Sequence, residues 1–168
     1  MRPTILLCCL LLAVPVYGRL DETIQEIEAR YGKPLKGVTP ESPATIAGLY
    51  QKNGFQITVG FYEGKAYYEQ YQKIDPQKPN SFLRISYAEQ ETLLKANCKG
   101  CNWTGNHTEI IDADSGVKNS DTAYDRSDGL AKALYRDNTG ILRIRSVKFE
   151  KQKEADDKER QQKNLKGF

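Results

Sequence analysis

Apolar side chains recur along the chain at helical and strand spacings, and together they predict an α+β protein. One set has the three- and four-residue spacing of a helix face: Leu20, Ile24, Ile27 and Tyr31. Gly32 suits the left-handed position that follows many helices, so this helix is expected to end there.

After this helix, apolar and polar residues alternate with the period of half-buried strands. We expect strands over 46–51, 55–61 and 66–73, joined by short turns that contain glycine. Since short turns join antiparallel neighbours, these strands are predicted to form a meander. The two prolines of segment 75–80 indicate a linker.

A second helix and a second set of strands follow in the same order. Ser86 and Glu89 have the spacing of a capping box, which predicts a helix from there to about Asn97. A long polar loop is expected over 98–120. The remaining strands are expected over 123–125, 130–136 and 141–149.

The two halves also share a short motif. Tyr50-Gln-Lys-Asn-Gly54-Phe55 resembles Tyr124-Asp-Arg-Ser-Asp-Gly129-Leu130, which has one inserted residue. We therefore predict two repeated units, each a helix plus a three-stranded antiparallel meander, with the helices packed on one side of a curved sheet. The expected layout is a signal peptide over 1–18, a first repeat over 19–80, a second over 81–149 and a polar charged tail over 150–168. The tail composition fits either a solvated helix or a disordered segment.

The first 18 residues have the pattern of a cleavable secretion signal. Arg2 gives a basic start, and residues 5–16 are apolar apart from Pro15. This run is shorter than the roughly 20 apolar residues that cross a bilayer. Cleavage is expected after Gly18, so we expect a secreted or periplasmic protein with no membrane insertion after cleavage.

Composition argues against several classes of function. The chain has 25 Lys and Arg residues against 22 Asp and Glu residues, a formal net charge of +3, which favours neither nucleic acid nor an acidic membrane as a partner. His107 is the sole histidine, and no nucleophile motif such as G-x-S-x-G accompanies it. We therefore predict no enzyme, no catalytic residue and no cofactor.

Cys98 and Cys101 are the two cysteines that lie outside the predicted signal. In an exported protein such a pair favours a disulfide, which is the interpretation we prefer. A thiol-disulfide-active protein is the alternative, although the pair follows a predicted helix end, where the helix dipole does not stabilise a thiolate. A structural zinc site needs four ligands and His107 supplies only a third, so no metal is predicted.

Tyrosines concentrate on one predicted strand. Tyr67, Tyr68 and Tyr71 lie on it, and Tyr62 precedes it. Strict alternation puts Tyr67 and Tyr71 on one face with Glu69, and Tyr68 on the other. Since aromatic residues are enriched at binding hot spots, the candidate partner-binding residues are Tyr67, Tyr71 and Tyr62. The alternative is that these rings pack within the sheet.

Two motifs carry a resemblance to a known family: Glu26-Ile-Glu-Ala-Arg-Tyr-Gly32-Lys-Pro34 and Val59-Gly-Phe61-Tyr-Glu-Gly64-Lys65. They resemble the helix ending in G-x-P and the V-x-F-x-x-G-K hairpin of the small outer-membrane assembly lipoproteins of the β-barrel assembly machinery. In tandem, the arrangement is similar to the β-lactamase inhibitory protein family, in which two such units form one curved sheet with helices on one side. The resemblance implies a fold and a protein-binding role. Because the chain lacks a lipidation cysteine, membrane attachment is not expected.

The leading hypothesis is therefore an exported, non-enzymatic module that binds another exported or envelope protein. A protease inhibitor is a further alternative, because Gln56-Ile-Thr-Val-Gly60 resembles the Q-x-V-x-G loop of the cystatins, with Thr58 in place of the central valine.

Overall fold

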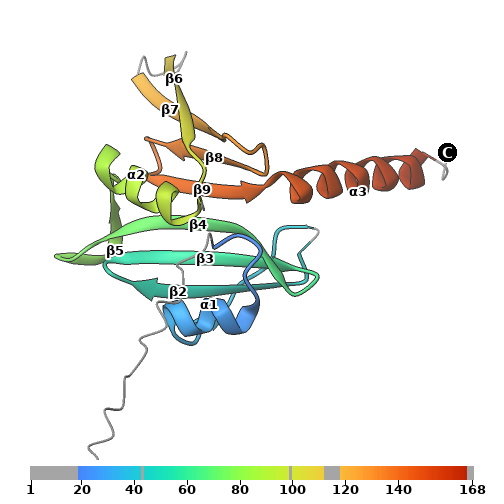
Figure 1. Cartoon of the computed structure of the whole chain (residues 1–168), viewed down its shortest axis with the longest axis horizontal. Coiled ribbons are helices and arrows are strands. Elements are labelled where there is room, and N and C mark those ends of the chain that lie inside the picture. The colour runs from blue at the N-terminus through green and yellow to red at the C-terminus, as the bar shows by residue number, and fades with distance from the viewer. Residues whose placement is uncertain (1–18, 43, 99, 112–117, 166–168) are drawn as a thin grey trace, which may run out of the picture.

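The computed structural model describes residues 19–42, 44–98, 100–111 and 118–165. Within this part of the chain there are three helices and nine strands, and the strands form one antiparallel sheet (Figure 1). The predicted α+β class is confirmed. The signal peptide predicted over 1–18 lies outside the described residues.

The two long meanders of the sheet meet at its centre. The helices are α1 (Ile24–Tyr31), α2 (Tyr87–Ala96) and α3 (Val147–Leu165). The strands are β1 (Lys36–Gly37), β2 (Ile46–Lys52), β3 (Phe55–Tyr62), β4 (Lys65–Asp75), β5 (Lys78–Leu83), β6 (Trp103–Ile111), β7 (Lys118–Arg126), β8 (Ala131–Arg136) and β9 (Ile141–Ser146). Their order across the sheet is β1-β2-β3-β4-β9-β8-β7-β6, and β5 pairs with the end of β4. The contact between β4 and β9 therefore joins β2–β4 to β7–β9.

Capping boxes begin both α1 and α2. In α1, the Thr23 hydroxyl accepts a hydrogen bond from the Glu26 amide at 3.3 Å, and the Glu26 carboxylate accepts one from the Thr23 amide at 2.7 Å. Helix α1 therefore starts after Thr23, and Leu20 packs in the core from outside the helix. In α2, Ser86 and Glu89 form the predicted capping box.

The prediction of a long polar loop over 98–120 is wrong. Its described residues include β6 and the start of β7, which pair along their whole lengths. Strand β6 is the last in the sheet, and its residues 104–108 are exposed. A strand with so little burial carries no apolar alternation, so the sequence pattern does not mark it.

Two further boundaries differ from the prediction. Segment 75–80, expected as a linker, contributes to β5, a short strand beside β4 that contains Pro79, as edge strands can. The last strand ends at Ser146, and α3 follows it, so the tail is helical as far as Leu165. Figure 1 shows α3 extending away from the sheet. No helix among the described residues is long and apolar enough to cross a membrane.

Helices α1 and α2 pack on the same face of the sheet. Ile27 of α1 and Leu94 of α2 join one buried cluster with Leu142 of β9. Full burial of such a side chain contributes roughly 1.5–3 kcal/mol to stability. By strand alternation, Arg143 and Arg145 of β9 lie on the opposite face, called the open face below.

A β-bulge between β3 and β4 changes the direction of one tyrosine. The register shifts after Gly60, which leaves Tyr67 as the extra residue of β4. Tyr67 lies beside Tyr68, with ring centroids 4.9 Å apart, and both rings pack in one cluster with Phe149 of α3. The prediction that Tyr67 and Tyr71 share a face is wrong, because alternation holds only within an unbroken ladder.

Candidate functional site

The tyrosines predicted to bind a partner have little exposed surface. Tyr71 is fully buried, Tyr67 is 5% exposed and Tyr62 is half-buried. The Tyr67 hydroxyl donates a hydrogen bond to the carbonyl oxygen of Glu41 at 2.8 Å. Tyr67 and Tyr71 therefore fit the alternative that these rings pack within the fold, because α1 and α2 cover Tyr71 and α3 packs on Tyr67.

A cluster of buried polar side chains surrounds Glu69 of β4. The Glu69 carboxylate accepts hydrogen bonds from the Tyr31 hydroxyl at 3.3 Å, from the Asn97 amide at 3.2 Å and from the Tyr71 hydroxyl. Arg19 donates to the Tyr71 hydroxyl at 2.7 Å. Since Tyr31 belongs to α1 and Asn97 follows α2, the cluster ties both helices to the centre of the sheet.

The enclosure of Glu69 favours a structural role over a catalytic one. Neither of the two cavities described below is lined by a residue of this cluster. Burial raises the pKa of the Glu69 carboxyl above its ordinary value of 4.5, while Arg19 and the hydrogen bonds from Tyr71 and Asn97 oppose this shift. Sequence reasoning placed Glu69 on the face of Tyr71 but gave it no function. The sequence did contain a signal for this role, because Glu69 is an acidic residue among the apolar positions of a predicted strand.

The raised pKa of Glu69 predicts that stability depends on pH. The folded state holds this proton more tightly than the unfolded chain, so the Glu69 contribution is largest below pH 4.5 and is lost as pH rises through the folded-state pKa. The slope is at most about 1.4 kcal/mol per pH unit. Urea unfolding across this range should show the slope in the wild type and its loss in Glu69→Gln. An unchanged slope in Glu69→Gln would contradict the assignment, and Glu63→Gln, at an exposed carboxylate, is the matched control.

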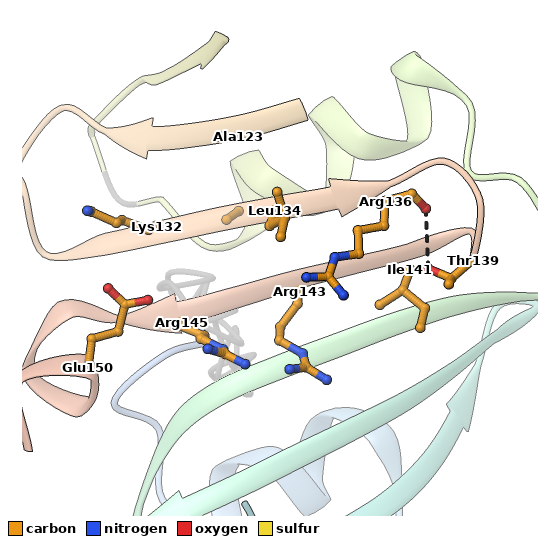
Figure 2. Close-up of a pocket in the computed structure, with 10 residues that line it drawn as sticks. Ala123, Lys132, Leu134, Arg136, Thr139, Ile141, Arg143, Arg145 and Glu150 are labelled. Carbon is orange, nitrogen blue, oxygen red and sulfur yellow. Dashed lines mark hydrogen bonds between the residues drawn. The ribbon is translucent and has the colours of Figure 1, made fainter. Parts of the chain in front are cut away.

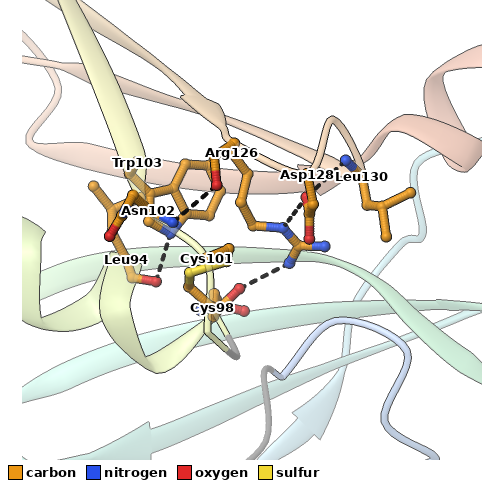
Figure 3. Close-up of a disulfide and its surroundings, with 10 residues drawn as sticks. Leu94, Cys98, Cys101, Asn102, Trp103, Arg126, Asp128 and Leu130 are labelled. Carbon is orange, nitrogen blue, oxygen red and sulfur yellow. Dashed lines mark hydrogen bonds and ion pairs between the residues drawn. A yellow bond between two sulfur atoms is a disulfide. The ribbon is translucent and has the colours of Figure 1, made fainter.

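Cys98 and Cys101 lie at disulfide distance, with Cα atoms 5.4 Å apart, directly after α2 (Figure 3). Two hydrogen bonds hold the surroundings in place. The Trp103 indole donates to the Leu94 carbonyl at 2.8 Å, and the Arg126 guanidinium donates to the Asn97 carbonyl at 2.8 Å. The pair therefore lies where the end of α2 meets β6 and β7, at the end of the helix whose dipole does not favour a thiolate.

His107 lies on β6 with its ring exposed. Its Nδ1 is 3.2 Å from the Thr122 hydroxyl. Among the described residues, no three His, Cys, Asp or Glu side chains gather into a group that would hold a metal ion.

A hollow of about 580 Å³ lies between α2 and strands β6, β7 and β8. Tyr124 and Tyr135 line it, but their hydroxyls already have partners. Tyr124 donates to Gln90 at 2.7 Å, and Tyr135 accepts from the Ile85 amide at 3.2 Å. The hydroxyls of both tyrosines are therefore already engaged within the fold.

The open face carries a second hollow of about 330 Å³ with a basic rim. Four cationic side chains line it, and we call this site the basic pocket: Lys132, Arg136, Arg143 and Arg145. Figure 2 shows Lys132 and Arg136 along β8 and the two other arginines on the neighbouring strand β9. Ala123, Leu134 and Ile141 provide apolar lining between the charges.

Strand register places these side chains in cross-strand rows. Lys132 is directly opposite Arg145, which is opposite Tyr68 of β4. In the next row, Leu134 is opposite Arg143. Like charges directly opposite each other destabilise a sheet, and the ion pair of Arg145 with Glu41 offsets this repulsion.

The positive charge of the basic pocket is partly compensated. Glu41 pairs with Arg143 at 3.4 Å and with Arg145 at 3.2 Å. Lys132 makes no ion pair within the described part of the chain. Burial, and then the neighbouring Arg145, lowers the pKa of the Arg143 guanidinium from its ordinary value. This pocket therefore has the chemistry to bind carboxylates.

Sequence reasoning missed the basic pocket. The chain is almost neutral, and no run of basic residues marks the site. The available signal was alternation, since Arg143 and Arg145 occupy the polar positions of a predicted strand whose apolar positions are buried. This pattern does not show that the charges of β8 and β9 lie side by side, because that depends on the register between the two strands.

Comparisons with known proteins do not identify a relative: no protein-family model, no curated protein and no solved structure matches the chain.

Proposed function

We propose that this protein is an exported, non-enzymatic module that binds another exported or envelope protein through the open face of its sheet. The observation that carries the proposal is the basic pocket, which four cationic side chains line together with apolar residues and one acid, Glu150, on the face opposite α1 and α2. Guanidinium groups are suited to carboxylates, which they bind with two parallel hydrogen bonds.

The shape of the sheet supports this proposal. We propose that the chain consists of two related units of helix plus meander, joined where β4 pairs with β9. The basic pocket lies on β8 and β9, next to this junction. In the β-lactamase inhibitory protein family, which the sequence resembles, a curved sheet made of two such units likewise serves protein binding.

A charge-reversal experiment tests the proposal. The chain from Arg19 onward is immobilised and exposed to the secreted or periplasmic fraction of its source, and retained proteins are quantified by mass spectrometry. The double variant Lys132→Glu and Arg136→Glu should lose a dominant partner by at least about tenfold, since reversed charges repel a complementary surface. Both side chains are exposed, and the expected cost to stability is repulsion of about 1 kcal/mol or less per pair, because the new glutamates would face Asp125 and Asp121 of β7.

The matched control reverses two exposed charges of α3, Lys158→Glu and Lys163→Glu, and should retain the partner. Equal retention by the wild type and by the pocket variant would exclude the basic pocket as the binding surface.

A further inference from the structure

We infer that the basic pocket accepts an extended acidic segment of the partner protein, and that Glu41 of this chain occupies part of that site until the segment displaces it. This inference rests on the proposed function and adds to it the chemistry of the partner and a means of regulating the site.

Glu41 makes the contacts expected of a ligand carboxylate. It comes from the segment between β1 and β2, 102 residues before Arg143 and 104 before Arg145. Its carboxylate lies 3.4 Å from Arg143 and 3.2 and 3.3 Å from Arg145. One carboxylate thus contacts two guanidinium groups, of which Arg143 also donates to the Gln70 side-chain oxygen at 3.0 Å. The Arg145 Nε atom has no hydrogen-bond partner among the described residues.

The backbone of Glu41 is held independently of its side chain. Its carbonyl oxygen accepts hydrogen bonds from the Tyr67 hydroxyl at 2.8 Å and from the Ala44 amide at 2.9 Å. The Glu41 carboxylate can therefore leave the arginines by side-chain rotation, while the chain around it stays in place. Displacement requires no unfolding of the sheet.

The spacing of the arginines specifies the shape of the incoming segment. Arg143 and Arg145 are two residues apart on β9, which places their Cα atoms roughly 7 Å apart along the strand, while their guanidinium groups converge on Glu41. An extended segment with acidic residues at every second position presents carboxylates at the same repeat. Its intervening apolar side chains would meet the apolar lining, in which Leu134 and Ile141 lie beside the charges.

The flanking charges favour a protein segment over a nucleic acid. Strand β7 places Asp125 opposite Lys132 and Asp121 opposite Arg136. Glu150 of α3 also lines the pocket, so acids limit the basic surface. A continuous phosphate backbone requires a longer uninterrupted basic surface than this pocket provides. A short acidic segment fits within the limited basic area.

A labelled peptide of alternating glutamate and valine tests this inference by fluorescence anisotropy on the full mature chain. Glu41→Gln should bind the peptide about fivefold to tenfold more tightly than the wild type, because the internal competitor loses its charge. Glu41→Ala, which removes the carboxylate without leaving an amide, should do the same. Glu63→Gln is the matched control, since Glu63 pairs with Lys148 outside the pocket, and it should bind as the wild type does.

Unchanged or weaker binding by both folded Glu41 variants would overturn the inference. Equal binding of a glutamine–valine peptide would overturn the charge requirement. Binding of a thymidine oligonucleotide as tight as that of the acidic peptide would overturn the choice of a protein segment. Tighter peptide binding by the Glu41 variants, together with partner capture that survives reversal at Lys132 and Arg136, would refute the proposed function while leaving the acidic-segment site intact.

Discussion

Replacing Tyr71 by alanine is expected to lower the free energy of unfolding by about 3–5 kcal/mol, the range for truncating a buried aromatic residue. The ring is fully buried in the main core. Its hydroxyl also accepts a hydrogen bond from Arg19 and donates one to Glu69. Alanine would leave a cavity and would remove partners from two buried polar groups. Urea unfolding followed by the fluorescence of the sole tryptophan, Trp103, measures the loss.

Two variants separate the causes of this loss. Tyr71→Phe keeps the ring and removes only the hydroxyl, so it should lower the free energy of unfolding by about 1–3 kcal/mol, because Glu69 stays buried with one donor fewer. Tyr87→Ala is the control, since this tyrosine is 66% exposed, and it should stay within about 0.5 kcal/mol of the wild type. Unfolding of Tyr71→Ala at the wild-type urea concentration would show that the ring does not lie in the core.

Replacing Gly60 by alanine is expected to lower the free energy of unfolding by about 1–3 kcal/mol through overpacking. A Cβ atom at Gly60 would lie 2.1 Å from the Tyr68 Cε1 atom and 2.9 Å from the Tyr67 hydroxyl. Both rings pack in the cluster that contains Phe149, so moving either ring away from the new Cβ would disturb that cluster. Thermal and urea unfolding measure the effect.

The clash at Gly60 has a specific suppressor. Tyr68→Ala removes the ring that the new Cβ would meet, so the double variant should be more stable than the sum of the two single changes predicts, by about 1 kcal/mol or more. Gly37→Ala is the control, because a Cβ there meets only the Ala47 carbonyl oxygen at 4.0 Å. If the changes in unfolding free energy of Gly60→Ala and Tyr68→Ala simply added in the double variant, the contact between the new Cβ and the Tyr68 ring would be contradicted.

Local signals in the sequence predicted much of the fold. The Ser86–Glu89 capping box placed the start of α2, because a cap satisfies backbone groups within one helical turn. The alternation from Phe55 to Phe61 placed β3, because one face of that strand is buried. Strand β6 was missed for the opposite reason, since its polar residues lie at the edge of the sheet and bury little.

The remaining errors come from interactions between distant segments. Alternation put Tyr67 on the wrong face, because the bulge at Gly60 inserts one residue and reverses every assignment before Tyr68. The basic pocket was missed because it requires β8 beside β9, and because Glu41 approaches β9 from the other half of the chain. Spacing along one strand carries no information about its neighbour.

The position of β9 between β4 and β8 has a consequence for how this chain folds. Strand β4 obtains its neighbour from residues 141–145, which follow it in the chain only after β5, α2, β6, β7 and β8. A nascent or truncated chain that stops earlier leaves much of one edge of β4 unpaired, and such an edge invites pairing with other chains. Pairings between segments this distant close late and slow the folding reaction. Productive assembly of β2–β4 must therefore wait until the chain has been made as far as β9.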